Sequence, residues 1–169
     1  MNIRSSLLLL LLLFSLESYN QKNNFSSYSV RNGLPQNTVY KIFQDSKGYL
    51  WLGTDGGGVS KFDGRDHTYF KKVDGLASNV IRDIHEDKAG NLWFATNEGL
   101  SIYDGNQFKT VAKEDGLISN TIVKIYEDSK GRTWVGSTGG GLSYVSLEDS
   151  LTIRNFTTND GLSSNNVLS

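Results

Sequence analysis

Apolar and polar residues alternate along short segments of this chain, and the segments recur in one order. TVYKIFQD carries its apolar side chains at Val39, Ile42 and Phe43, and its counterparts read VIRDIHED and TIVKIYED. A five-residue run such as LWLGT follows each of them. GVSKFDG then ends in Asp-Gly, which favours a hairpin turn, and HTYFKKV supplies a fourth extended run. No stretch between glycines shows the 3.6-residue periodicity expected of a ten-residue helix.

The same four segments return with a nearly constant period. Gly-Leu pairs begin at Gly33, Gly75, Gly116 and Gly161, so their separations are 42, 41 and 45 residues. Periods near forty are typical of repeat proteins, including helical ones. Because the alternation here has the period of strands, each repeat predicts four short antiparallel strands, which form one blade of a β-propeller. The fold class is therefore all-β.

A second set of residues marks the turn and strand inside each repeat. Asp45, Asp87 and Asp128 begin a D-x-x-G turn, and an aspartate there can cap the turn with its side chain while the glycine takes a positive φ. The following strand holds a tryptophan two residues before a Gly or Ala. A large indole beside a small residue suits sheets that stack closely. We interpret the repeated phrase as packing. The residues concerned are Gly48, Gly90, Gly131, Trp51, Trp93 and Trp134.

The first residues are predicted to form a signal peptide. Arg4 precedes the apolar run LLLLLLLF (7–14), which is too short to cross a bilayer comfortably, and polar residues follow it at once. A buried apolar helix is the competing interpretation. We expect residues 1–18 to be a cleaved signal peptide, 19–24 a polar linker and 25–169 the propeller part. Export to the periplasm is the predicted localisation. The chain has no cysteine, which excludes a lipoprotein anchor and a disulfide framework.

The strand count predicts an incomplete ring. Residues 25–30 match the last strand of a repeat, the full repeats at about 33–74, 75–115 and 116–160 give twelve strands, and NNVLS within 161–169 begins another. The expected total is 14 strands, or about three and a half blades, whereas closed propellers have at least four. We therefore expect an N-terminal fragment of a longer protein. Two chains closing one seven-bladed ring is the alternative, and open blade edges predict some self-association.

Composition and charge leave few classes of partner. The 17 Lys and Arg residues nearly balance 18 Asp and Glu residues, and no run of one sign suggests a nucleic-acid or anionic membrane surface. We expect no nucleic-acid partner and no cofactor.

Catalytic and metal-binding interpretations lack the residues they need. His85 takes the position of Phe43 and Tyr126, which predicts a packed ring, and His67 has no ligand partner at useful spacing. The aspartates that begin the D-x-x-G turns lack the spacing of a calcium loop. The acid pairs Glu86-Asp87 and Glu127-Asp128 put their two carboxylates on opposite faces of a strand, unlike a glycosidase pair. The glycine runs TDGGGVS and STGGGLS lack the Lys-Ser/Thr ending of a phosphate loop. We predict no catalytic and no metal site.

A ligand site is expected among positions that differ between repeats, since positions that recur serve packing. Asp55, Arg65, His67, Arg82 and Asn97 are such positions. The sequence alone does not say which of them share one mouth of the ring, so the ligand-binding residues stay unknown at this point.

The stretch GLPQNTVYKIFQDSKGYLWLGTDGGGVSKFDG resembles the two-component regulator propeller repeat, from about Phe25 to the end of the chain. The resemblance implies the periplasmic sensor region of a Bacteroidetes-type hybrid histidine kinase. Such a region would respond to oligosaccharides, and further blades or sensor-kinase domains would follow it. The second copy lacks the glycine pair and is one residue shorter, and SLEDS lengthens a hairpin in the third. A non-enzymatic, carbohydrate-responsive sensor module is the predicted function. A propeller binding scaffold or a fragment of a carbohydrate-active enzyme is the alternative.

Overall fold

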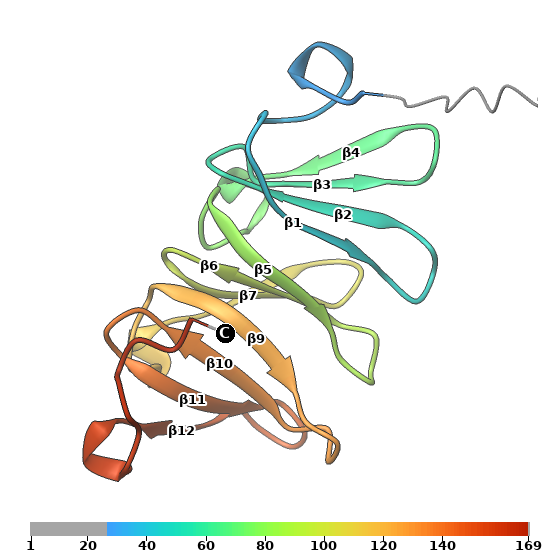
Figure 1. Ribbon diagram of the computed structural model, residues 1–169. Coiled ribbons are helices and arrows are strands. Elements are labelled where there is room, and N and C mark those ends of the chain that lie inside the picture. The colour runs from blue at the N-terminus through green and yellow to red at the C-terminus, as the bar shows by residue number, and fades with distance from the viewer. Residues whose placement is uncertain (1–26, 169) are drawn as a thin grey trace, which may run out of the picture.

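The computed structural model describes residues 27–168 as three four-stranded antiparallel sheets, in each of which strand order follows chain order (Figure 1). The first sheet contains β1 (Val39–Gln44), β2 (Leu50–Thr54), β3 (Val59–Phe62) and β4 (His67–Phe70). The second contains β5 (Ile81–Glu86), β6 (Leu92–Thr96), β7 (Gly99–Tyr103) and β8 (Phe108–Val111). The third contains β9 (Ile122–Glu127), β10 (Thr133–Ser137), β11 (Gly141–Ser146) and β12 (Thr152–Phe156). Each sheet is one propeller blade, so the predicted all-β, four-stranded blades are confirmed.

The blades stack face to face, with their first strands adjacent. In Figure 1 the first blade is teal, the second green to yellow and the third orange to red, and β1, β5 and β9 lie along one side of the stack. These inner strands contact one another from blade to blade. Each carries a bulge near its start, where the register shifts against the second strand. The bulge lets Ile81 and Ile84, three residues apart, both face Gly53 of the first blade.

The strand expected at 25–30 is not found in its described part. Residues 27–29 are irregular, and Val30–Asn32 form the 3₁₀ helix η1. This segment forms no β-ladder with any described strand, and a strand needs such a neighbour for its backbone hydrogen bonds. Tyr28 packs instead against the edge of the Phe62 ring, with the ring centroids 5.7 Å apart. The predicted signal peptide and linker lie outside the described residues.

The half-blade expected near the C-terminus is present as a segment but not as a strand. Residues 165–168 are irregular, although the Val167 N–H donates to the Ser137 carbonyl at 3.0 Å. Twelve strands are thus formed in residues 27–168, two fewer than the sequence suggested. With three complete blades the array is an incomplete propeller.

One asparagine per repeat joins each blade to the next. The Asn79 side chain accepts the Lys72 N–H at 2.7 Å and so holds the 3₁₀ helix η2 (Lys72–Asp74). Its backbone carbonyl accepts the Gly58 N–H at 2.8 Å, from the turn between β2 and β3 of the preceding blade. The same pair of bonds is made by Asn120 at η3 (Lys113–Asp115) and by Asn165 at η4 (Thr158–Asp160). The glycine runs are therefore turns between the second and third strands of a blade, and their N–H groups bond to the segment that follows the blade.

Candidate functional site

The D-x-x-G turn and the tryptophan form one hydrogen-bonded unit in every blade. One oxygen of Asp45 accepts the N–H groups of Lys47 and Tyr49 at 3.0 and 2.9 Å, and the other accepts the indole N–H of Trp51 at 2.8 Å. The predicted cap is confirmed, and the indole bond is an addition that fixes the tryptophan ring. The aspartate serves the turn, because its oxygens are engaged by the backbone and the ring.

The same unit in the third blade shifts the titration of its acid. Burial works against ionisation of Asp128, but hydrogen bonds from the Trp134 indole and from Arg132 and Lys130 hold the pKa of its carboxyl far below the ordinary value. These hydrogen bonds therefore favour the ionised form of the carboxylate. A calcium or acid–base role would need free oxygens that this carboxylate does not have.

The inner strands carry a charge ladder that sequence analysis did not identify. Lys41, Asp83 and Lys124 occupy the same position in successive repeats. The Lys41 Nζ lies 2.8 Å from one oxygen of Asp83 and the Lys124 Nζ lies 3.1 Å from the other. Asp83 is only 2% exposed and also accepts the Ile125 N–H at 3.1 Å. One buried carboxylate therefore links all three blades.

Two opposing effects act on Asp83. Burial raises the pKa of its carboxyl, but the hydrogen bonds from Lys41, Ile125 and Lys124 lower it further, so the net pKa lies below its ordinary value. The three charges are thus retained together near the axis of the blades. The sequence signal for this ladder was the change of charge, from positive to negative to positive, at one position of successive repeats. That signal can be interpreted only once the inner strands are known to be neighbours.

The five positions proposed for ligand contact do not converge. Arg82 and Asn97 do meet, since the Arg82 Nε donates to the Asn97 Oδ1 at 3.1 Å. Asp55 bridges to Val80 at the same rim of the blades. Arg65 lies in the exposed turn between β3 and β4 on the opposite rim. The variable positions are therefore divided between two rims.

Both histidines are held by neighbours rather than by a metal site. His67 stacks on Phe62 with the ring centroids 4.5 Å apart, and its Nδ1 lies 2.8 Å from the Ser60 hydroxyl. His85 differs from the packed ring expected, because it is half-buried and its Nε2 lies 3.4 Å from a Glu127 oxygen. No group of three His, Asp or Glu side chains suited to a metal occurs within residues 27–168.

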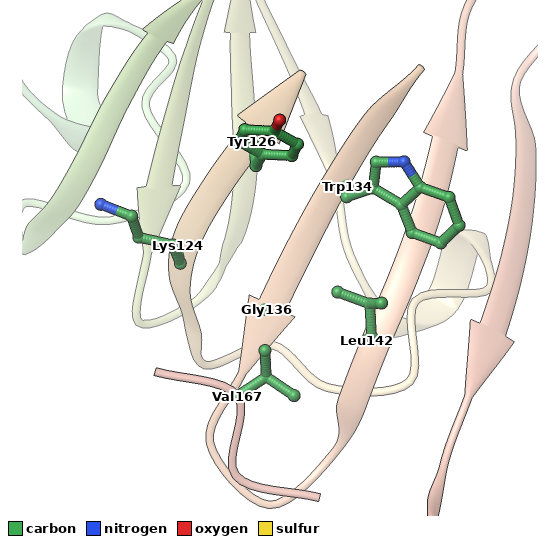
Figure 2. Close-up of a pocket in the computed structure, with 6 residues that line it drawn as sticks. All are labelled: Lys124, Tyr126, Trp134, Gly136, Leu142 and Val167. Carbon is green, nitrogen blue, oxygen red and sulfur yellow. The ribbon is translucent and has the colours of Figure 1, made fainter. Parts of the chain in front are cut away.

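The third blade leaves its outer face uncovered. Figure 2 shows Tyr126, Trp134 and Leu142 on this face, with Val167 beside Gly136. Trp51 and Trp93 are 1% and 2% exposed because a following blade covers them, whereas Trp134 is only partly buried. A Cβ on Gly136 would lie 3.0 Å from a Val167 methyl, as one on Gly53 would meet Ile81. This apolar groove is therefore a blade-stacking surface, of which Val167 fills one corner.

The opposite end of the stack is open in the same way. Ile42 on the first blade is 63% exposed, whereas its equivalents Ile84 and Ile125 are 2% and 5% exposed. The two ends of the stack are therefore the two complementary surfaces of one blade-to-blade contact. An apolar face at each end is what a fan of stacked repeats exposes.

A family model describes the repeated part of the chain. The model of the two-component regulator propeller matches residues 33–56, 75–98 and 116–139, which run from each Gly-Leu pair to the turn after the tryptophan strand. The chain carries three copies of the two-component regulator propeller repeat. In these regulator propeller repeats the matched residues include the asparagine, aspartate and tryptophan whose packing roles are described above. No curated protein matches the chain.

Solved structures agree with the regulator propeller assignment. The extracellular domain of the hybrid two-component system BT3049 from B. thetaiotaomicron is 28% identical with a TM-score of 0.73, over 82% of this chain and 19% of that one. The extracellular domain of BT4673 from the same organism is 29% identical with a TM-score of 0.62, over 75% and 20%. PorZ, a surface component of the type-IX secretion system of Porphyromonas gingivalis, is 20% identical with a TM-score of 0.61, over 82% and 24%, which shows the fold alone.

The regulator propeller chain is short beside these relatives. It spans about a fifth of the length of the two B. thetaiotaomicron domains. Within residues 27–168 no helix has the length and apolar character to span a membrane.

Proposed function

We propose that the chain is an exported, ligand-sensing module of a two-component signalling system that responds to carbohydrate. The observation that supports this most directly is the presence of three regulator propeller repeats together with 28–29% identity to two extracellular domains of such systems. The apolar run at Leu7–Phe14 supports secretion to the periplasm with removal of residues 1–18.

The proposal includes how the module works. The blades supply a rigid scaffold, and the signal passes to further blades or to sensor-kinase domains through the uncovered faces at Ile42 and Trp134. The chain itself does no chemistry in this scheme. Among the described residues the acids best placed for catalysis are engaged in turns or in the charge ladder.

A panel of oligosaccharides tests this proposal with the full chain. Each glycan is scored twice, for binding by isothermal titration calorimetry and for cleavage by chromatography of the mixture after prolonged incubation. Binding without turnover is the expected result. Turnover would contradict the sensor proposal and favour a carbohydrate-active enzyme, and a panel with no binding would contradict carbohydrate sensing.

A further inference from the structure

The two seams between blades are packed with different side chains. The seam between the first and second blades is aromatic, with Tyr103 at 4.7 Å from Phe108 and 5.5 Å from Phe70, measured between ring centroids. At the seam between the second and third blades the equivalent positions are aliphatic. The replacements are Val111 for Phe70, Val135 for Phe94, Val145 for Tyr103 and Ile153 for Phe108. The second seam therefore lacks most of the ring volume of the first.

A cavity opens where the rings are missing. It has a volume of about 370 Å³ and lies between the D-x-x-G turns of the second and third blades, against Trp93 and Val145. The equivalent space in the first seam, where Tyr103 stands, is only about 70 Å³. Ligand pockets typically measure roughly 300–1,000 Å³, so the cavity in the second seam has the size of a small-ligand site and its counterpart does not.

The acid at this seam is also left with incomplete hydrogen bonding. In the first seam Glu86 accepts the Ser46 N–H at 2.6 Å and the Ser46 hydroxyl at 2.7 Å. Glu127 is the equivalent acid in the second seam, and its side chain is 10% exposed. Its contacts with His85 at 3.4 Å and with Lys88 at 3.5 Å are longer than ordinary hydrogen bonds. Glu127 thus offers acceptor oxygens to the cavity that Glu86 cannot offer.

The charged side chains that line the cavity are of both signs. Lys88 and Lys130 supply ammonium donors at the cavity, and Glu127 and Glu148 supply carboxylate acceptors. Asp87 adds no free acceptor, because its oxygens are bonded to its own turn and to the Trp93 indole. A site that offers both donors and acceptors favours a ligand whose groups both donate and accept, as hydroxyls do.

We propose that the cavity between the second and third blades is the ligand site and that it takes a neutral, polyhydroxylated sugar unit. This inference rests on the proposed carbohydrate-sensing function and states where on the protein the carbohydrate binds. The ligand displaces water above Trp93 and Val145, accepts from Lys130, and donates to Glu127 and Glu148. The cavity exists because the third repeat has Val145 where the second has Tyr103. The recurring D-x-x-G turns and Trp93 form the walls of the cavity.

The test uses calorimetric titration of the full chain with cellobiose, maltose and xylobiose, beside glucuronic acid and glycylglycine as charged probes. Val145→Tyr places in the second seam the ring that closes the first, so affinity for a neutral disaccharide should fall at least about tenfold. Lys130→Ala should weaken binding several-fold. Lys47→Ala is the matched control, because Lys47 holds the same repeat position beside the small cavity and its loss should change nothing.

Far-UV circular dichroism confirms that each variant is folded. If Val145→Tyr does not fold, Lys130→Ala and Glu148→Gln, both at exposed positions, test the site in its place, with Lys47→Ala again as the control. Unaltered binding by the cavity variants overturns the site while leaving the sensor function intact. Binding of charged probes alone overturns the ligand class. Failure of all saccharides, including the larger glycan panel, overturns the carbohydrate function itself.

Discussion

The carboxylate of Asp45 accepts the indole N–H of Trp51 at 2.8 Å, although the two residues are six positions apart in the sequence. The corresponding distances are 2.7 Å in the second blade and 3.1 Å in the third. One carboxylate thereby shapes the turn and orients the ring that the next blade covers. The recurring D-x-x-G-x-x-W pattern is best understood as this single bonded unit.

Asp87→Asn tests the bonded unit in the central blade. An asparagine can keep one turn bond, but it loses the charge that strengthens the bond to the Trp93 indole. We expect the free energy of unfolding to fall by roughly 1.5–3 kcal/mol, measured by urea denaturation. Asp104→Asn is the control, since Asp104 caps a turn by accepting the N–H groups of Asn106 and Gln107 and its turn has no tryptophan partner. Equal losses in the two variants would show that the indole bond adds nothing.

Asp83→Asn tests the charge ladder. The substitution leaves Lys41 and Lys124 without the buried carboxylate that joins them. Removing one partner of a buried ion pair costs roughly 3–5 kcal/mol, and we expect a loss of this order in urea denaturation. Asp66→Asn, at a highly exposed pair with Arg65, should cost little. A similar small loss for both would contradict the role given to the ladder.

The same carboxylate predicts how stability depends on pH. Because the folded pKa of Asp83 lies below its ordinary value, the unfolded chain binds its proton first as the pH falls. The stability due to Asp83 is therefore fully present well above about pH 4 and is lost as the pH drops through the folded pKa. Thermal unfolding from pH 7 to pH 3 should show a steeper loss in the wild type than in Asp83→Asn. Parallel curves would contradict this.

Gly53 tests the close approach of two blades. A Cβ at Gly53 would lie 2.7 Å from an Ile81 methyl and 3.3 Å from Ile84, both in the core of the first seam. Gly53→Ala should cost about 1–3 kcal/mol in the free energy of unfolding. At Gly136 the new Cβ would lie 2.7 Å from the Val167 backbone oxygen, but Val167 belongs to an irregular segment outside the blades, so Gly136→Ala should cost less. A larger loss of stability for Gly136→Ala than for Gly53→Ala would contradict the close approach of the first two blades at Gly53.

The uncovered faces predict self-association. Ile42 and Tyr126 are both 63% exposed on the two ends of the stack, and large exposed apolar faces favour contact between molecules. The double variant Ile42→Ser, Tyr126→Ser should shift sedimentation-velocity profiles toward the monomer at the same concentration. Val73→Ser is the control, because Val73 is exposed on η2 and away from both faces. If the sedimentation of the double variant depends on concentration as that of the wild type does, self-association through these two faces is contradicted.

Blade architecture could be predicted from the sequence because each blade is specified locally. Alternation, the Asp-Gly hairpin and the D-x-x-G turn lie within one repeat, so no knowledge of distant contacts is needed. The strand expected at 25–30 was wrong in its described part, since a strand also requires a neighbour that pattern alone does not supply. Residues 165–168 likewise form no strand, although hydrogen bonds join them to Ser137, Gly139 and Gly141 of the third blade.

Contacts between blades were the part that could not be foreseen. The charges of Lys41, Asp83 and Lys124 stood at one repeat position, but only the stacking of inner strands turns them into a ladder. The exchange of Tyr103 for Val145 was likewise visible as a difference, yet its effect depends on which side of the strand faces the seam. Positions that differ did mark the proposed site, although the particular five named from the sequence did not.

The indole N–H resonances of the three tryptophans give the most direct test of the central claim, that recurring residues pack the blades and the second seam binds the ligand. Trp51 borders the small cavity of the first seam, Trp93 borders the larger cavity of the second seam and Trp134 lies on the open face. A ¹H–¹⁵N correlation spectrum of the full chain, titrated with a neutral disaccharide that binds, should move the Trp93 cross-peak and leave the other two in place. Movement of the Trp134 cross-peak with Trp93 unmoved would contradict the claim.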